Sequence, residues 1–182
     1  MIQNTHDWAN FVFGNCDLND KRREKRLVRM AGGLADNIGK SVVKSSSTPA
    51  EIEGNYRLIR NQHVKAASIA EGGFASTVSL TENYDEILAL EDTTTLSYKR
   101  GQLPDKLGYI TNSTTSRLTG FSAHSILLYS PQAQHTIGLI EQQRWVRDAE
   151  EFGKRKDKGR PYKEKESYKW EVASEAMSQR LG

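Results

Sequence analysis

The spacing of apolar positions changes about halfway along the chain, and the change separates two groups of predicted elements. In the first part, apolar residues recur with a helical period. Leu27, Ala31, Leu34 and Ile38, for example, fall at i, i+4, i+7 and i+11. The pattern predicts four helices, over residues 6–15, 20–38, 50–59 and 64–83. The segment Asp17–Asp20 supplies N-cap candidates for the second helix, and Gly39 is its expected end. Thr48 or Ser47 could cap the third helix.

The second part of the chain has the alternation and β-branched content of strands. Strands are predicted over residues 87–98, 122–129 and 135–146, with a hairpin connection at Ser130–Gln134. Residues 148–162 are charged and predict an exposed loop, and residues 164–181 predict a helix with Trp170 and Ala173 toward the core. The fold class is therefore α+β (α/β), with a helical domain over residues 1–65 and a sheet-containing domain over residues 66–182.

The distribution of charge is more informative than its total. The formal net charge is +3 and the pI is about 8.9, a mild preference for anionic partners. Asp20–Lys40 contains seven basic and three acidic residues, whereas Glu71–Tyr98 contains six acidic residues and no lysine or arginine. The first segment should attract polyanions, and the second should repel them unless cations intervene.

Several functional classes are disfavoured by what the sequence contains. A single cysteine, Cys16, excludes an internal disulfide framework and a thiolate metal cage. The N-terminus lacks the pattern of a signal peptide, and no apolar run approaches the ~20 residues of a membrane span. We therefore expect a cytoplasmic, nucleoid-associated protein with no membrane partner. The histidines have no metal-ligand spacing: His6, His63, His124 and His135.

A basic face on the second predicted helix is the first candidate for function. Arg22, Arg26 and Arg29 lie roughly opposite the apolar stripe at about 100° per residue. Such a face can contact phosphates or guanine edges of DNA. The alternative is an ordinary solvated helix surface. Lys40 and Arg57 could extend the positive surface.

An acidic pair in the first predicted strand is the second candidate. Asp92, with Glu91, follows an apolar run and precedes three threonines. A carboxylate on a buried strand is costly unless it is paired or binds a cation, and oxygen ligands suit Mg²⁺ or Mn²⁺. The alternative is that Asp92 only caps a turn. His124, set among apolar neighbours, is interpreted as a core histidine rather than a catalytic base.

An ordered set of segments resembles the N-terminal part of bacterial cut-and-paste transposases of the IS-four, or Tn-five-like, family. No single segment is decisive, but together they span nearly the whole chain. The segments are Asp7–Ala9 with Phe13, Asp20–Arg23 with Arg26 and Leu27, Gly39–Ser41, Glu53–Asn61, Leu90–Tyr98, His124–Leu128, Thr136–Leu139 and Lys165–Trp170. The chain departs from a well-known relative at Asp36 and Asn37, where that relative has lysine and tyrosine, so its DNA end sequence cannot be transferred.

The resemblance implies a helical domain that binds the terminal repeats of a transposon, followed by an RNase H-like mixed sheet. In the family, a DDE triad holds two Mg²⁺ (or Mn²⁺) ions for cleavage and joining of double-stranded DNA. Asp92 takes the place of the first aspartate. The second aspartate and the glutamate are expected beyond the last residue, so we expect an incomplete sheet and a chain that cannot hold two metal ions with one carboxylate or cleave DNA alone. The predicted DNA-binding residues are Arg22, Arg23, Arg26, Lys40 and Arg57.

Two alternatives follow from an incomplete catalytic domain. The chain could be a non-catalytic regulator that occupies transposon ends, or that pairs with full-length transposase or a second copy of itself. It could also be a decayed remnant, since an unpaired sheet edge disfavours stable folding.

Overall fold

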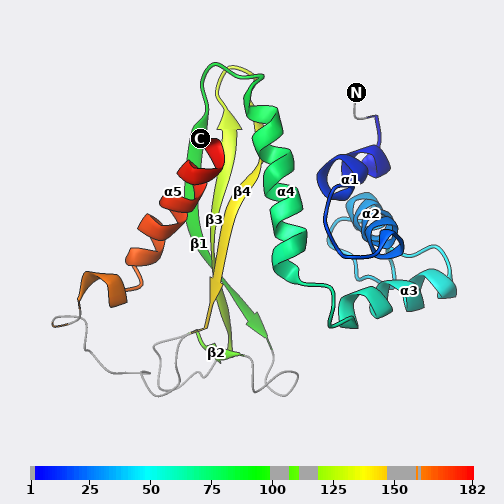
Figure 1. Ribbon diagram of the computed structural model, residues 1–182. Coiled ribbons are helices and arrows are strands. Elements are labelled where there is room, and N and C mark those ends of the chain that lie inside the picture. The colour runs from blue at the N-terminus through cyan, green and yellow to red at the C-terminus, as the bar shows by residue number, and fades with distance from the viewer. Residues whose placement is uncertain (1–2, 99–106, 111–118, 147–158, 160) are drawn as a thin grey trace. The chain divides into compact units, whose positions relative to one another are not determined.

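The computed structural model describes residues 3–98, 107–110, 119–146, 159 and 161–182. The chain divides into two compact units, Met1–Glu82 and Asn83–Gly182 (Figure 1). The sequence placed the boundary after residue 65, whereas the fourth helix, residues 66–81, lies in the first unit of the structure. This helix packs against the first helix, a contact that a pattern of spacing alone does not reveal.

All the regular secondary structure in the described residues of the first unit is α-helical. It consists of α1 (Thr5–Phe13), α2 (Lys21–Asp36), α3 (Pro49–Arg60) and α4 (Ala66–Thr81). The structure selects one cap from each set of candidates: the Asp20 carboxylate accepts from the Arg22 amide, and the Thr48 hydroxyl accepts from the Glu51 amide. These caps fix where α2 and α3 begin, and so fix which side chains each helix turns outward.

One position of the predicted apolar stripe is wrong. Leu27 is buried, but α2 ends at Asp36 and Ile38 is 89% exposed. The helix stops because Asn37 leaves the helical conformation and Gly39, at φ +79°, turns the chain. Ile38 therefore lies outside the helix whose periodicity it appeared to continue.

A small apolar core holds the first unit together. Its buried members are Cys16, Leu18, Leu27 and Leu58. The Gly72–Gly73 pair, which the sequence marks as a weak point of a helix, is the place where α4 meets the chain after α1. A Cβ at Gly72 would collide with the Cys16 thiol, whereas a Cβ at Gly73 would make ordinary contacts of 3.8 Å. Gly72 is thus needed for close packing.

The second unit is a four-stranded antiparallel sheet covered by a helix. Its strands are β1 (Leu88–Tyr98), β2 (Gly108–Tyr109), β3 (Thr119–Ser130) and β4 (His135–Trp145). The central strand is β3, with β1 along one edge and β4 and β2 along the other. The α+β class is confirmed. A mixed sheet was predicted, but every pairing among the described strands is antiparallel.

Helix α5 (Tyr168–Leu181) follows a short 3-10 helix, η4 (Tyr162–Glu164), and packs on β3 and β4 (Figure 1). Ala173 is fully buried as predicted, and the half-exposed Trp170 lays its ring 4.6 Å from the ring of His124. The predicted loop over residues 148–162 falls almost wholly outside the described residues. None of the helices in the described ranges is both long and apolar enough to cross a membrane.

Candidate functional site

The outward face of α2 carries a row of cations. Arg22, Lys25 and Arg29 are exposed and lie on the side of the helix opposite buried Leu27 and Val28. None of the three forms an ion pair with the part of the chain that the structure describes. Their charges are therefore not neutralised within those residues and face solvent, where a polyanion could reach them.

The five residues predicted to bind DNA occupy different environments. Arg22 and Lys40 are exposed. The Arg23 guanidinium donates a hydrogen bond to the Leu18 carbonyl at 3.0 Å, which ties the start of α2 to the preceding loop. Arg57, on α3, is exposed and forms an ion pair with Glu53 at 2.9 Å. The structure brings some of these side chains into internal contacts that the sequence did not indicate.

Arg26 is the clearest example of an internal role. Its guanidinium lies over Gly54 of α3, so closely that a Cβ there would approach the Arg26 Cζ atom to 2.7 Å. The missing side chain of Gly54 makes room for the arginine between the two helices. DNA contact by Arg26 stays a prediction, but its position in the structure is at the α2–α3 contact.

The acidic pair on β1 is split between the two faces of the sheet. Side chains alternate along a strand, so neighbouring residues point to opposite sides. Glu91 lies on the face that α5 covers, where its carboxylate accepts a hydrogen bond from the Ser174 hydroxyl at 2.7 Å. Asp92 is exposed on the other face. The two carboxylates therefore do not act as a pair.

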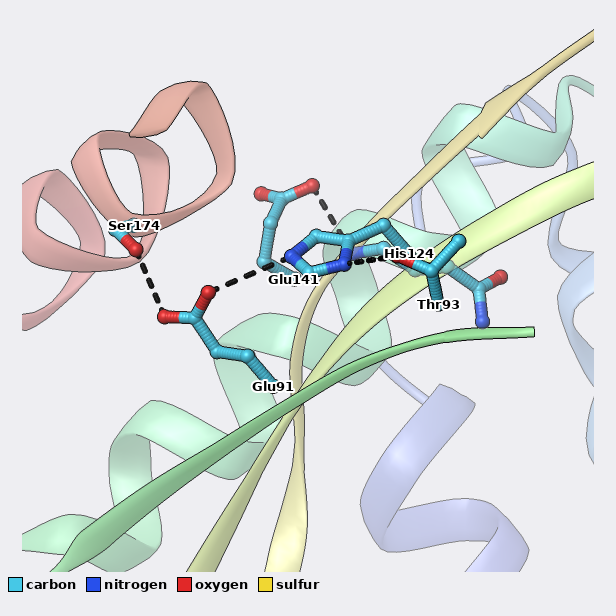
Figure 2. A network of polar contacts seen from close by, with 6 residues as sticks. Glu91, Thr93, His124, Glu141 and Ser174 are labelled. Atoms are coloured by element: carbon cyan, nitrogen blue, oxygen red, sulfur yellow. Dashed lines mark hydrogen bonds and ion pairs between the residues drawn. The ribbon is translucent and has the colours of Figure 1, made fainter. Parts of the chain in front are cut away.

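His124 lies on β3, the strand next to this part of β1, and is fully buried (Figure 2). Its Nδ1 atom makes a 2.9 Å hydrogen bond with the Thr93 hydroxyl, and its Nε2 atom lies 3.5 Å from a Glu91 carboxylate oxygen. The second contact is close enough for electrostatic attraction, but Nε2 makes no hydrogen bond in the described structure. One imidazole thus contacts the residues on both sides of Asp92.

A second polar contact joins α5 to the sheet. The Arg180 guanidinium forms an ion pair with the Glu141 carboxylate of β4 at 3.1 Å, and Glu141 is nearly buried. Burying a carboxylate is costly unless a cation and hydrogen bonds satisfy it, and here they are supplied. The His124 and Glu141 contacts together fix the helix-covered face of the sheet.

The described residues do not form a metal site by themselves. They contain no group of three histidine, cysteine, aspartate or glutamate side chains placed to hold an ion. Asp92 faces away from Glu91 and His124, so neither complements it as a ligand. The role of Asp92 as a metal ligand stays a prediction.

Sequence reasoning identified His124 as a core residue, and the structure agrees, but it missed the contacts of His124 with Glu91 and Thr93. The alternation of strand residues could have shown that Glu91 and Asp92 face opposite sides. No sequence signal names His124 as the partner of Thr93, because that contact depends on the pairing register of β1 and β3.

The four-helix first unit, with its outward cations on α2, has the features of a helical DNA-binding domain. Residues 5–64 match the family model described as transposase DNA-binding. The match covers α1, α2 and α3, including the cationic face and Gly54. The first unit thus contains a helical DNA-binding domain similar to those of transposases.

Proposed function

We propose that the chain recognises double-stranded DNA at the terminal repeats of a transposon, through its first unit. The observation that carries the proposal is the row of cations without ion pairs among the described residues, Arg22, Lys25 and Arg29, on a helix within the matched segment. The IS-four-like segments of the sequence support the assignment to transposon ends.

Most of the binding free energy would come from phosphates. Arg22, Lys25, Arg29 and Lys40 present exposed charges rather than a set of paired donors, which suits phosphate contact more than base reading. Each phosphate contact releases condensed counterions, so affinity should fall steeply as salt rises. Arg23 and Arg26 would support the surface by holding α2 in place.

The second unit would be the beginning of an RNase H-like catalytic domain. The order of three long antiparallel strands followed by a helix supports this, as does an aspartate in the middle of the edge strand β1. In that role Asp92 would supply one oxygen ligand to Mg²⁺ or Mn²⁺. Further carboxylates would be needed, since one side chain cannot hold two ions.

A non-catalytic regulator is the second candidate. It is favoured by the contrast between a cationic surface exposed on α2 and an Asp92 that has no companion ligand among the described residues. Such a protein would occupy transposon ends, or join a full-length transposase or a second copy, without cutting. Co-expression with an intact, related transposase separates the two: a regulator lowers transposition frequency, and a chain without this role leaves it unchanged.

DNA binding is tested by selecting duplexes from a random library with the full chain, then measuring fluorescence anisotropy against the selected duplex and a scrambled one. We expect preference for the selected duplex and affinity that decreases with salt. Equal, salt-insensitive or undetectable binding to both duplexes would overturn the proposal.

The role of Asp92 is tested separately. Mn²⁺ broadens NMR signals of nuclei near its binding site, so we expect weak broadening centred on Asp92 in the wild type and its loss in Asp92→Ala. Broadening that persists in the variant would remove Asp92 from the proposed metal site. Mg²⁺-dependent nicking of the selected duplex by this chain, abolished by Asp92→Ala, would overturn the expectation that it cannot cleave alone.

A further inference from the structure

Ile38 is unlike every other exposed apolar side chain in the described residues. The other large apolar side chains at the surface are between 38% and 54% exposed, so part of each is covered, whereas Ile38 is 89% exposed. A single exposed apolar residue needs no explanation by itself. Its geometry and surroundings, however, distinguish this one.

Ile38 occupies the corner of a hydrogen-bonded turn. The Lys40 amide donates to the Asn37 carbonyl at 2.9 Å, and the Asn37 side-chain amide donates to the Gly33 carbonyl at 3.1 Å. Gly39 provides the positive φ of 79° that closes the turn. Ile38 is thus held outward by hydrogen bonds on both sides, so little conformational entropy would be lost if a partner covered it.

The nearest charged residues that follow Ile38 are cationic, whereas Asp36, two residues before it, carries an exposed carboxylate that accepts a hydrogen bond from the Thr5 hydroxyl at 2.6 Å. Lys40 follows the corner directly, and its ammonium group donates to the Asn37 side-chain oxygen at 3.0 Å, a neutral partner that leaves the positive charge in place. Lys44, in the same connection, is exposed. This charge favours a polyanion over an apolar protein surface. Duplex DNA offers phosphates beside apolar base surfaces and thymine methyl groups.

We propose that Ile38 makes an apolar contact with the bases of duplex DNA while Lys40 contacts a neighbouring phosphate. The inference rests on the proposed DNA-binding function and adds to it a residue that no charge pattern reveals. The turn would place Ile38 as a wedge or methyl contact at the end of α2, where binding covers a side chain that the free protein leaves in water.

The test compares Ile38→Ser, Ile38→Val and Lys40→Ala in the full chain, with the duplex selected from the random library as probe. Ile38→Ser should weaken binding about tenfold at every salt concentration, because an apolar contact releases no counterions. In Ile38→Ser, the slope of log affinity against log salt concentration should be the same as in the wild type. Lys40→Ala should reduce that slope by about one. Ile38→Val, which keeps most of the apolar surface, should bind nearly as well as the wild type.

Leu181→Ser is the matched control, since it removes an exposed apolar side chain from the second unit and should leave affinity unchanged. Unchanged affinity in Ile38→Ser, with Lys40→Ala weakened, would overturn the Ile38 contact and leave the proposed function intact. An Ile38→Ser variant that binds DNA normally but no longer self-associates would assign the corner to a second copy instead. Failure of the wild type to bind any duplex would overturn the proposed function itself.

Discussion

The two units differ in where their candidate functional side chains lie: at the surface of the first and partly in the interior of the second. In the first unit the core is apolar around Cys16, and the cations of α2 face solvent. In the second unit the imidazole of His124 is fully buried and contacts Thr93 and Glu91. Substitutions of the exposed cations of α2, Arg22, Lys25 and Arg29, should therefore change binding with little change in stability. Substitutions of His124 and the residues that it contacts should mainly lower the stability of the second unit. They should change any function of Asp92 only as a consequence of that lower stability.

The largest effect that the comparison predicts is at His124. His124→Ala removes a fully buried ring, its hydrogen bond to Thr93 and its contact with Trp170, and should lower the free energy of unfolding of the second unit by about 3 kcal/mol. Hydrogen exchange of the β1 amides measures this. His135→Ala, at an exposed histidine, is the control and should cost less than about 1 kcal/mol. Equal effects of the two variants would refute the buried role.

The next effect separates two adjacent glycines in the first unit. Gly72→Ala places a methyl group against the Cys16 thiol and should destabilise the unit by about 2 kcal/mol. Gly73→Ala meets only contacts of 3.8 Å and should be neutral or stabilise α4 by up to about 1 kcal/mol. Thermal unfolding followed by far-UV circular dichroism compares them. Similar midpoints for the two variants would contradict the close packing at Gly72.

A smaller effect tests the separation of binding from stability. Arg29→Ala should weaken DNA binding by about 1 kcal/mol and reduce the salt slope by about one, with an unchanged unfolding midpoint. Arg23→Ala should do the reverse, since its guanidinium bonds to the Leu18 carbonyl: a lower midpoint and a salt slope like that of the wild type. Fluorescence anisotropy titrations at several salt concentrations measure the affinity and the salt slope, and thermal unfolding measures the midpoint. A smaller salt dependence of DNA affinity in Arg23→Ala than in the wild type would instead indicate that Arg23 contacts DNA.

The smallest effect concerns pH and is confined to the first unit. Burial, and then the nearby Glu24 carboxylate, raise the pKa of the Cys16 thiol above its ordinary value of 9.0. Above the unfolded pKa the unfolded thiol ionises while the folded one stays neutral, so this contribution is full at lower pH and is lost as pH rises from about 9 through the folded pKa. Urea unfolding at neutral and alkaline pH should show a decline that Cys16→Ala reduces. An identical decline in both proteins would exclude the thiol.

Local signals predicted the elements well because they act over a few residues. The caps Asp20 and Thr48 and the turn at Ser130–Gln134 each mark an end that the chain itself determines. The contacts of Arg23 and Arg26 were not predictable, because their partners are a loop carbonyl and a gap at Gly54 on another helix. Both arginines look like surface charges in a sequence.

The prediction that Ile38 belongs to the apolar stripe of α2 was wrong for a related reason. The apolar spacing of α2 extends to Ile38 in the sequence, but the backbone conformations of Asn37 and Gly39 end the helix before that residue. The candidate site was predicted in part: Asp92 and His124 were singled out separately, while their relation through Glu91 and Thr93 required the register of two strands.

The pairing register of β1 and β3 limits which insertions and deletions the chain can tolerate during evolution. β1 and β3 pair without interruption from Leu88 to Tyr98, whereas the β3–β4 pairing contains two shifts. A one-residue insertion or deletion within β1 would exchange the positions of Glu91 and Asp92, bringing the wrong carboxylate inside and leaving the Thr93 hydroxyl facing water. Loss of one codon is therefore more damaging on this strand than most single substitutions, and β4, whose bulges already absorb extra residues, is where the sheet can tolerate a change in length.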